Sequence, residues 1–150
     1  CEEHSFFASS IMKRRNAREL VLKLLFQSDF TGKRPEEKDF DELFGKDSKD
    51  AESRAFSEDI VNGTLDNLEE IDSTIQKAAE HWVLQRMAAV DRNILRYAVY
   101  ELLYRKDIPS AVCINEAIEI AKKYSTLESA SFINGLLDKV AKGIKGRKAR

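Results

Sequence analysis

The sequence predicts an all-α domain of about seven helices, and three observations support this fold class. Apolar residues recur mainly at intervals of three and four, whereas the strict apolar/polar alternation of a half-buried strand persists nowhere. Only two prolines interrupt the 150 residues. The hydrophobic fraction of 43% and the charged fraction of 34% are typical of one domain that buries a core beneath a charged surface.

The first helix is expected over residues 13–29. One of its faces carries a stripe spaced by four, consisting of Leu22, Phe26 and Phe30. A helix with two apolar faces is either covered by neighbouring helices, which is the commoner case, or contacts another molecule. The other apolar arc can face the core and contains Ala17, Leu20, Val21, Leu24 and Leu25.

The remaining helices are assigned from apolar spacing and from residues suited to their ends. The polar residues from Gly45 to Asp50 are expected to form a loop. The second helix is expected to begin after Pro35, and the third to span residues 51–69. The fourth runs from a cap at Asp72 or Ser73 to Glu80, and the fifth spans residues 90–105. The sixth follows Pro109, and the seventh follows a capping box of Ser125 and Glu128.

Charge is distributed unevenly along a chain whose formal net charge is −1. Residues 13–34 carry seven basic and two acidic side chains, and residues 35–80 carry five basic and fifteen acidic ones. The last twelve residues carry six basic side chains and no acidic one. If the basic ends meet, they form a positive patch that is typical of a polyanion site, although two solvated tails explain the same charges equally well.

No catalytic constellation is apparent in the sequence, so we expect no enzyme activity and assign no catalytic residue, cofactor or metal ligand. Two cysteines and two histidines make no metal-ligand cluster, and six scattered glycines make no phosphate loop. Cys113 lies on an apolar helical face and suits a small core residue better than a nucleophile. The low cysteine content favours a reducing, cytoplasmic compartment, and no apolar run approaches the ~20 residues that span a bilayer.

Three stretches of the second half carry a resemblance to a known family, namely ILRYAVYELLYR (94–105), DIPSAVCINEAIEIAKKY (107–124) and FINGLLDKVA (132–141). RRNARELVLKLLFQ (14–27) adds a fourth stretch. In order and spacing these stretches resemble the NusB family of bacterial transcription antitermination factors. Residues 31–80 resemble it only in helical character and acidity. The resemblance implies an all-helical fold of two packed subdomains.

The resemblance also sets an expected domain organisation. Met12 followed by KRR resembles a natural start, and residues 1–11 lack the features of a secretory signal. We therefore expect residues 1–11 to be an N-terminal extension or an artefact, residues 12–145 to be the NusB-like RNA-binding domain, and residues 146–150 to be a basic C-terminal tail.

The function implied by the resemblance is binding of the boxA element of ribosomal RNA leaders together with NusE, a small-subunit ribosomal protein. That pair helps to assemble a processive RNA polymerase complex that also contains NusA and NusG. Some members self-associate through surfaces that overlap the RNA site, so a homodimer remains a second arrangement. No membrane contact is expected.

The implied RNA site combines the basic start of the first helix with the start of the last. Arginine offers forked donors to phosphate, and an exposed Phe132 can stack on an unpaired base, although core packing explains Phe132 equally well. Asn16 and Ser131 stand where basic residues are common in the family. The implied RNA-binding residues are Lys13, Arg14, Arg15, Arg18, Glu128, Ser129, Ser131 and Phe132, and the implied NusE face carries Leu22, Phe26 and Asp91.

Two alternatives of other classes remain. NusB-like domains also occur at the N-terminus of RNA cytosine methyltransferases, but such an enzyme needs a separate domain for S-adenosylmethionine, so the length of 150 residues argues against this alternative. The other alternative is a helical scaffold that binds only proteins and whose basic ends are incidental. Absence of RNA binding even in the presence of NusE would favour the scaffold.

Overall fold

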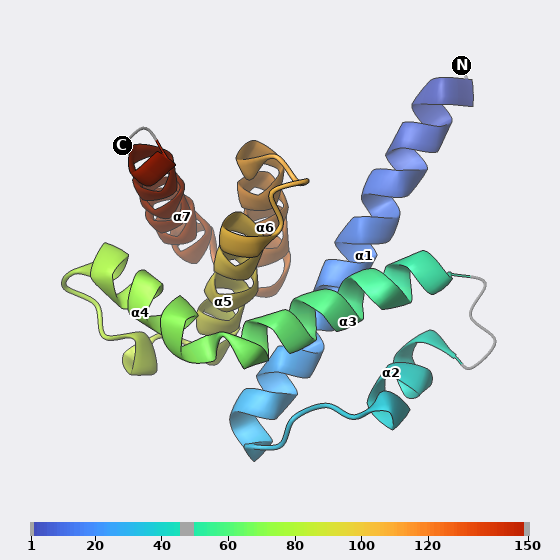
Figure 1. Cartoon of the computed structure of the whole chain (residues 1–150), viewed down its shortest axis with the longest axis horizontal. Helices are drawn as coiled ribbons and strands as arrows, with labels where there is room; N and C mark the ends of the chain where they lie inside the picture. Colours follow the sequence, from blue (N-terminus) through green and yellow to red (C-terminus); the bar gives the residue numbers. More distant parts are fainter. Residues whose placement is uncertain (1, 46–49, 149–150) are drawn as a thin grey trace. The chain divides into compact units, whose positions relative to one another are not determined.

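The computed structural model describes residues 2–45 and 50–148, and within these ranges it contains seven α-helices, one short 3-10 helix and no strand (Figure 1). The predicted all-α class is therefore confirmed. No helix in the described part of the chain is long and apolar enough to cross a membrane. The helices are α1 (Glu2–Thr31), α2 (Glu37–Phe44), α3 (Ala51–Asp66), α4 (Leu68–Ala79), the 3-10 helix η1 (Leu84–Arg86), α5 (Ala89–Tyr104), α6 (Ser110–Tyr124) and α7 (Leu127–Lys148).

The chain divides into two compact units, of which unit 1 ends at Asn62 and unit 2 begins at Gly63. Unit 1 contains α1, α2 and most of α3. The hydroxyl of Ser57 in α3 donates to the carbonyl of Ala17 in α1 across 3.3 Å. Arg54 ties α3 to α2, because its Nη1 lies 2.6 Å from Oδ1 of Asp41. The buried apolar residues of unit 1 include Val21, Leu24, Leu25, Phe40, Phe56, Ile60 and Val61.

α5 is the central helix of unit 2. Every residue from Asn93 to Leu102 is buried, and α4, α6 and α7 all pack against this helix. A helix covered around its whole circumference needs apolar side chains on every face, which explains the nearly continuous apolar sequence. Arg96 is the cation of this buried stretch, and its Nε and Nη2 donate to the carboxylate of Asp72 in α4 across 2.8 and 2.9 Å.

Gly63 lies close to α5. A Cβ at this position would overlap the ring of Tyr100, which is 6% exposed. A glycine inside a helix costs about 1 kcal/mol relative to alanine. The close approach of an aromatic ring therefore explains why this position within α3 is a glycine.

Several helix ends differ from the predicted ones. α1 begins at Glu2 instead of residue 13. Residues 2–11, which were expected to precede the first helix, are therefore part of it. α7 continues to Lys148, so the first residues of the expected tail are helical. Residues 46–49 of the expected loop lie outside the described residues. The short 3-10 helix Leu84–Arg86 was not predicted.

The predicted caps are wrong at two helices. The expected helix over residues 51–69 is interrupted at Asn67, so α4 begins at Leu68 and Asp72 lies inside it. The side-chain amide of Asn67 donates to the carbonyl of Gly63 across 2.8 Å. At α7 the cap is Thr126 instead of Ser125, because the Thr126 hydroxyl accepts the backbone N–H of Ser129 across 2.9 Å.

Candidate functional site

The basic stretch of α1 from Lys13 to Arg18 combines exposed and buried cations. Lys13 and Arg14 are exposed, Arg15 is half-buried, and Arg18 is only 1% exposed. Arg14 and Arg18 lie one turn apart, and their guanidinium carbons lie 4.9 and 5.1 Å from the ring centroid of Phe56 in α3. Of the four predicted phosphate contacts on α1, Lys13 and Arg14 are therefore the accessible ones.

Arg18 differs from the expectation that it contacts RNA. A guanidinium over an aromatic face is stabilised by about 1 kcal/mol, or more when it is desolvated, as here. With almost no exposed surface, Arg18 cannot meet a phosphate without displacing its neighbours. Its place on Phe56 makes it a residue that holds the middle of α1 against α3 within unit 1.

The second apolar stripe of α1 changes from buried to exposed along its length. Leu22 is 6% exposed, Phe26 is 40% exposed and Phe30 is 87% exposed. Successive members of such a series rotate by about 40° around the helix axis, because 3.6 residues make one turn. Leu22 is therefore a core residue, contrary to the prediction that placed it on a partner face. Phe26 and Phe30 form the exposed end of the stripe.

Asp91 forms a hydrogen-bonded cluster in unit 2. Asp91 is 9% exposed, and its carboxylate accepts the hydroxyls of Ser125 and Ser129 across 2.7 and 2.8 Å. Ser125 precedes α7 and Ser129 lies in its first turn, so the carboxylate ties the start of α5 to the start of α7. Asp91, expected to face a protein, is thus joined to Ser129, expected to face RNA.

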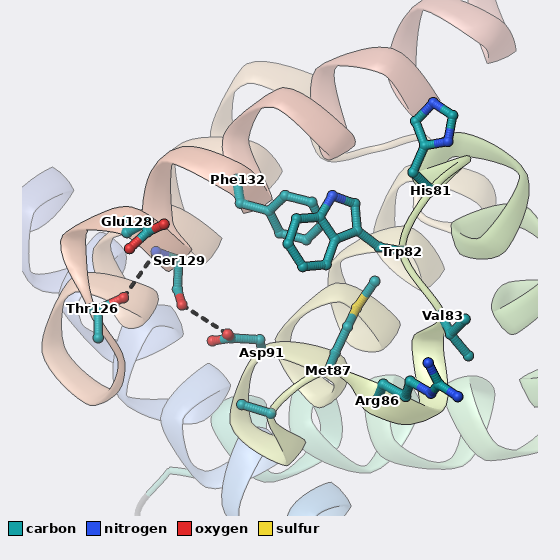
Figure 2. A pocket seen from close by; sticks show the side chains of 11 residues that line it. His81, Trp82, Val83, Arg86, Met87, Asp91, Thr126, Glu128, Ser129 and Phe132 are labelled. Carbon is teal, nitrogen blue, oxygen red and sulfur yellow. Dashed lines mark hydrogen bonds between the residues drawn. The ribbon is translucent and has the colours of Figure 1, made fainter.

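A pocket of about 540 Å³ opens beside this cluster (Figure 2). Asp91 and three of the predicted RNA-binding residues of α7 line it, namely Glu128, Ser129 and Phe132. Trp82, from the segment between α4 and η1, lies edge-to-face with Phe132, with ring centroids 5.5 Å apart and an interplanar angle of 62°. Ser131 is the fourth predicted RNA-binding residue of α7; it is exposed on the helix but does not line the pocket.

Trp82 and Arg86 also line the pocket, although no sequence pattern indicates them as site residues. Both belong to the segment around η1, where apolar periodicity fails and gives no indication of which side chains face solvent. Trp82 is 60% exposed. An exposed tryptophan is unusual enough to draw attention, but its exposure cannot be read from its type alone.

The predicted RNA-binding residues thus form two groups, which are described separately. Lys13, Arg14, Arg15 and Arg18 belong to unit 1, and Glu128, Ser129, Ser131 and Phe132 belong to unit 2. Among the described residues, no group of His, Cys, Asp and Glu side chains is arranged to hold a metal ion.

Comparison with known proteins gives consistent matches. The sequence model of the NusB family matches residues 15–142. The transcription antitermination protein NusB of Thermodesulfovibrio yellowstonii is 43% identical over 140 residues, which cover 87% of this chain and 93% of that protein. The solved structure of NusB from T. maritima is 43% identical with a TM-score of 0.78, covering 86% of this chain and 90% of that one.

A further solved structure, described as the antitermination factors NusB and NusE in complex with dsRNA, has a TM-score of 0.78 at 27% identity. The match covers 88% of this chain and 98% of that one. The family match spans most of the chain, and relatives at this identity are covered almost completely. The chain therefore belongs to the NusB family of transcription antitermination proteins.

Proposed function

We propose that this protein binds the boxA RNA of ribosomal RNA leaders together with NusE, as an RNA-binding adaptor and not an enzyme. In the cytoplasm it would join the RNA polymerase antitermination complex that contains NusA and NusG. The observation that carries the proposal is the similarity to a solved NusB structure that is described as a complex with NusE and dsRNA. Three features support the same proposal, namely the exposed cations of α1, the aromatic pocket at the start of α7 and the exposed phenylalanines of α1.

Lys13 and Arg14 bind RNA phosphates in this proposal. Both are exposed on α1, and no acidic residue lies between them and Glu19. The guanidinium of Arg14 lies over the ring of Phe56, which restricts its motion and lowers the entropy lost on binding. Arg15 is half-buried and contributes less, and Arg18 acts by positioning the helix.

The start of α7 binds RNA through its exposed groups. Glu128 and Ser131 are exposed, and half-buried Phe132 reaches the pocket. The Ser129 hydroxyl already donates to Asp91, so we assign Ser129 to holding the first turn of α7 in place. An aromatic ring with polar neighbours suits single-stranded RNA, whose unstacked bases offer both faces and hydrogen-bonding edges.

Phe26 and Phe30 form the NusE face in this proposal. Exposed aromatic side chains are enriched at protein interfaces and often carry a large share of the binding energy. Two such rings one turn apart are costly to leave in water, which supports a protein partner for them. Asp91 acts indirectly on the RNA-binding start of α7, because its two carboxylate oxygens accept the hydroxyls of Ser125 and Ser129. Leu22 supports this face from the core beneath it.

The test is a titration of labelled boxA RNA and a scrambled RNA of equal length, with and without NusE, at two salt concentrations. We expect preference for boxA, tighter binding with NusE, and an affinity that falls with salt as phosphate contacts release counterions. Sedimentation in the same buffers separates NusE binding from self-association. No RNA binding in the presence of NusE would refute the proposal and favour a scaffold that binds only proteins.

A further inference from the structure

We propose that Trp82 and the pocket beside it form a subsite for one unpaired nucleobase of single-stranded RNA. The ligand class rests on the proposed function. The subsite, its principal residue and its mode of binding go beyond that function, because neither the basic stretch of α1 nor Phe132 alone requires Trp82 to contact RNA.

Trp82 is exposed in a way that packing does not explain. It is the only tryptophan of the chain, and 60% of its surface is accessible to water. Its ring contact with Phe132 is edge-to-face, and both rings lie at the pocket (Figure 2). A large aromatic side chain gains most from burial, and a planar base is the ligand that best covers a planar indole face.

The backbone that carries Trp82 is held by hydrogen bonds on both sides. The side-chain amide of Gln76 donates to the carbonyl of Trp82 across 2.6 Å and accepts the N–H of Leu84 across 2.9 Å. From the other side, Nη1 of Arg92 donates to the carbonyl of Met87 across 3.0 Å. A platform fixed in this way loses little conformational entropy when a ligand binds.

The same segment begins with a strained residue. Glu80 follows the last residue of α4 with φ of 48° and ψ of −71°. Among the residues that the structure describes, it is the only one other than glycine with a positive φ. Lys139 of α7 donates to the carbonyl of Ala78 across 3.2 Å and to Oε1 of Glu80 across 2.6 Å. Such strain persists only where surrounding contacts impose it, and it occurs preferentially at binding sites.

The pocket has the size and polar groups that a base requires. Its volume of about 540 Å³ lies within the range of small-molecule sites. Arg86 and His81 offer donors, while Glu128 and the hydroxyl of Thr126 offer acceptors. A base can therefore stack on Trp82 and present its edge to these groups, with Arg86 available to the adjoining phosphate.

Because Trp82 is the only tryptophan, its intrinsic fluorescence reports directly on the proposed stacking. The protein is titrated with single-stranded boxA RNA while its tryptophan emission and the anisotropy of labelled RNA are both recorded. We expect quenching with the same midpoint as the anisotropy change. A perfectly paired duplex of that sequence should give little quenching, because its bases are not free to stack.

Three variants complete the test. Trp82→Leu keeps apolar bulk without an aromatic face and is expected to weaken single-stranded RNA binding at least about fivefold, whereas Trp82→Phe should recover most of that loss. Val112→Ala is the matched control, since Val112 is 43% exposed on α6 and does not line the pocket. Circular dichroism melts verify that each variant is folded.

The outcomes separate this inference from the proposed function. RNA binding without tryptophan quenching, or with Trp82→Leu equal to the wild type, would overturn the subsite and leave the proposed function standing. Absence of RNA binding by the wild type in the presence of NusE would overturn both. If Trp82→Leu does not fold, quenching of the wild type and the affinity of Trp82→Phe still decide the matter.

Discussion

Replacing Asp91 by alanine is expected to destabilise the protein and to loosen the start of α7. The carboxylate accepts hydroxyls from Ser125 and Ser129 at 2.7 and 2.8 Å. A hydrogen bond to a charged group contributes about 1.5–3 kcal/mol, so the pair contributes up to about 6 kcal/mol. Both serines are half-buried and can turn toward water in the variant, so we expect a net loss of about 2–3 kcal/mol.

Urea unfolding followed by circular dichroism measures this loss, which corresponds to a decrease of the melting temperature by about 5–10 °C. A double-mutant cycle of Asp91→Ala with Ser129→Ala isolates one of the two bonds. We expect a coupling free energy of about 1 kcal/mol or more, because groups in direct contact do not act additively. Asp91→Asn should fall between the wild type and Asp91→Ala, since an amide oxygen can still accept one hydroxyl.

The outcome that would refute this reasoning is additivity within about 0.5 kcal/mol, or an unchanged unfolding free energy of Asp91→Ala. Either result would mean that the carboxylate does not hold the two segments together. The same variants also test the link to binding. With a loosened α7, RNA affinity should fall at temperatures where the variant is still folded.

Three further predictions concern other parts of the chain. Arg14→Ala should reduce the slope of log K for RNA against log salt by roughly one, as fluorescence anisotropy at several salt concentrations can measure. Phe26→Ala should weaken NusE binding about tenfold or more with little change in melting temperature, whereas Leu22→Ala should cost about 2–4 kcal/mol of stability. The hydrogen bond from Tyr104 to Glu70 raises the pKa of Tyr104 above its usual value of 10.0, so Glu70→Gln should lower that pKa in an ultraviolet titration.

Each of these predictions has an opposing result. An unchanged salt slope for a folded Arg14→Ala excludes its phosphate contact. A large fall in the melting temperature of Phe26→Ala would make Phe26 a core residue. The pKa of Tyr104 is higher in the folded than in the unfolded protein, so its hydrogen bond stabilises the folded state. This contribution is complete at a pH below the pKa of the unfolded state and is lost as the pH rises through the pKa of the folded state. Stability that instead increases on alkaline titration of this group would contradict the hydrogen bond.

Local periodicity was sufficient to predict the fold class and the most apolar helices. The helix expected over residues 90–105 differs from α5 by one residue at each end, because its apolar sequence and its burial have the same cause. The break at Asn67 could not be predicted, since helical spacing continues through it. The choice of Thr126 over Ser125 as a cap depends on Asp91, which lies far away in sequence and engages the Ser125 hydroxyl.

The candidate site was predictable in its residue types and less so in its exposures. The sequence assigns basic and aromatic residues to α1 and α7, but it does not show that Arg18 lies over Phe56. Nor does it show that Leu22 is covered while Phe26 is open to solvent. Burial is decided by partners distant in the chain, and a helical pattern alone defines directions around an axis without stating what lies in each direction.

The contact between Gly63 and Tyr100 limits how this protein can be engineered. Exchanging a helical glycine for alanine is a common stabilising substitution, because it restricts the unfolded chain and improves helix propensity. At Gly63 the same exchange would force the methyl group into a buried ring and reverse the sign of the effect. Directed evolution for heat resistance should therefore leave this position untouched and accept changes at Gly135, where added carbon meets open space.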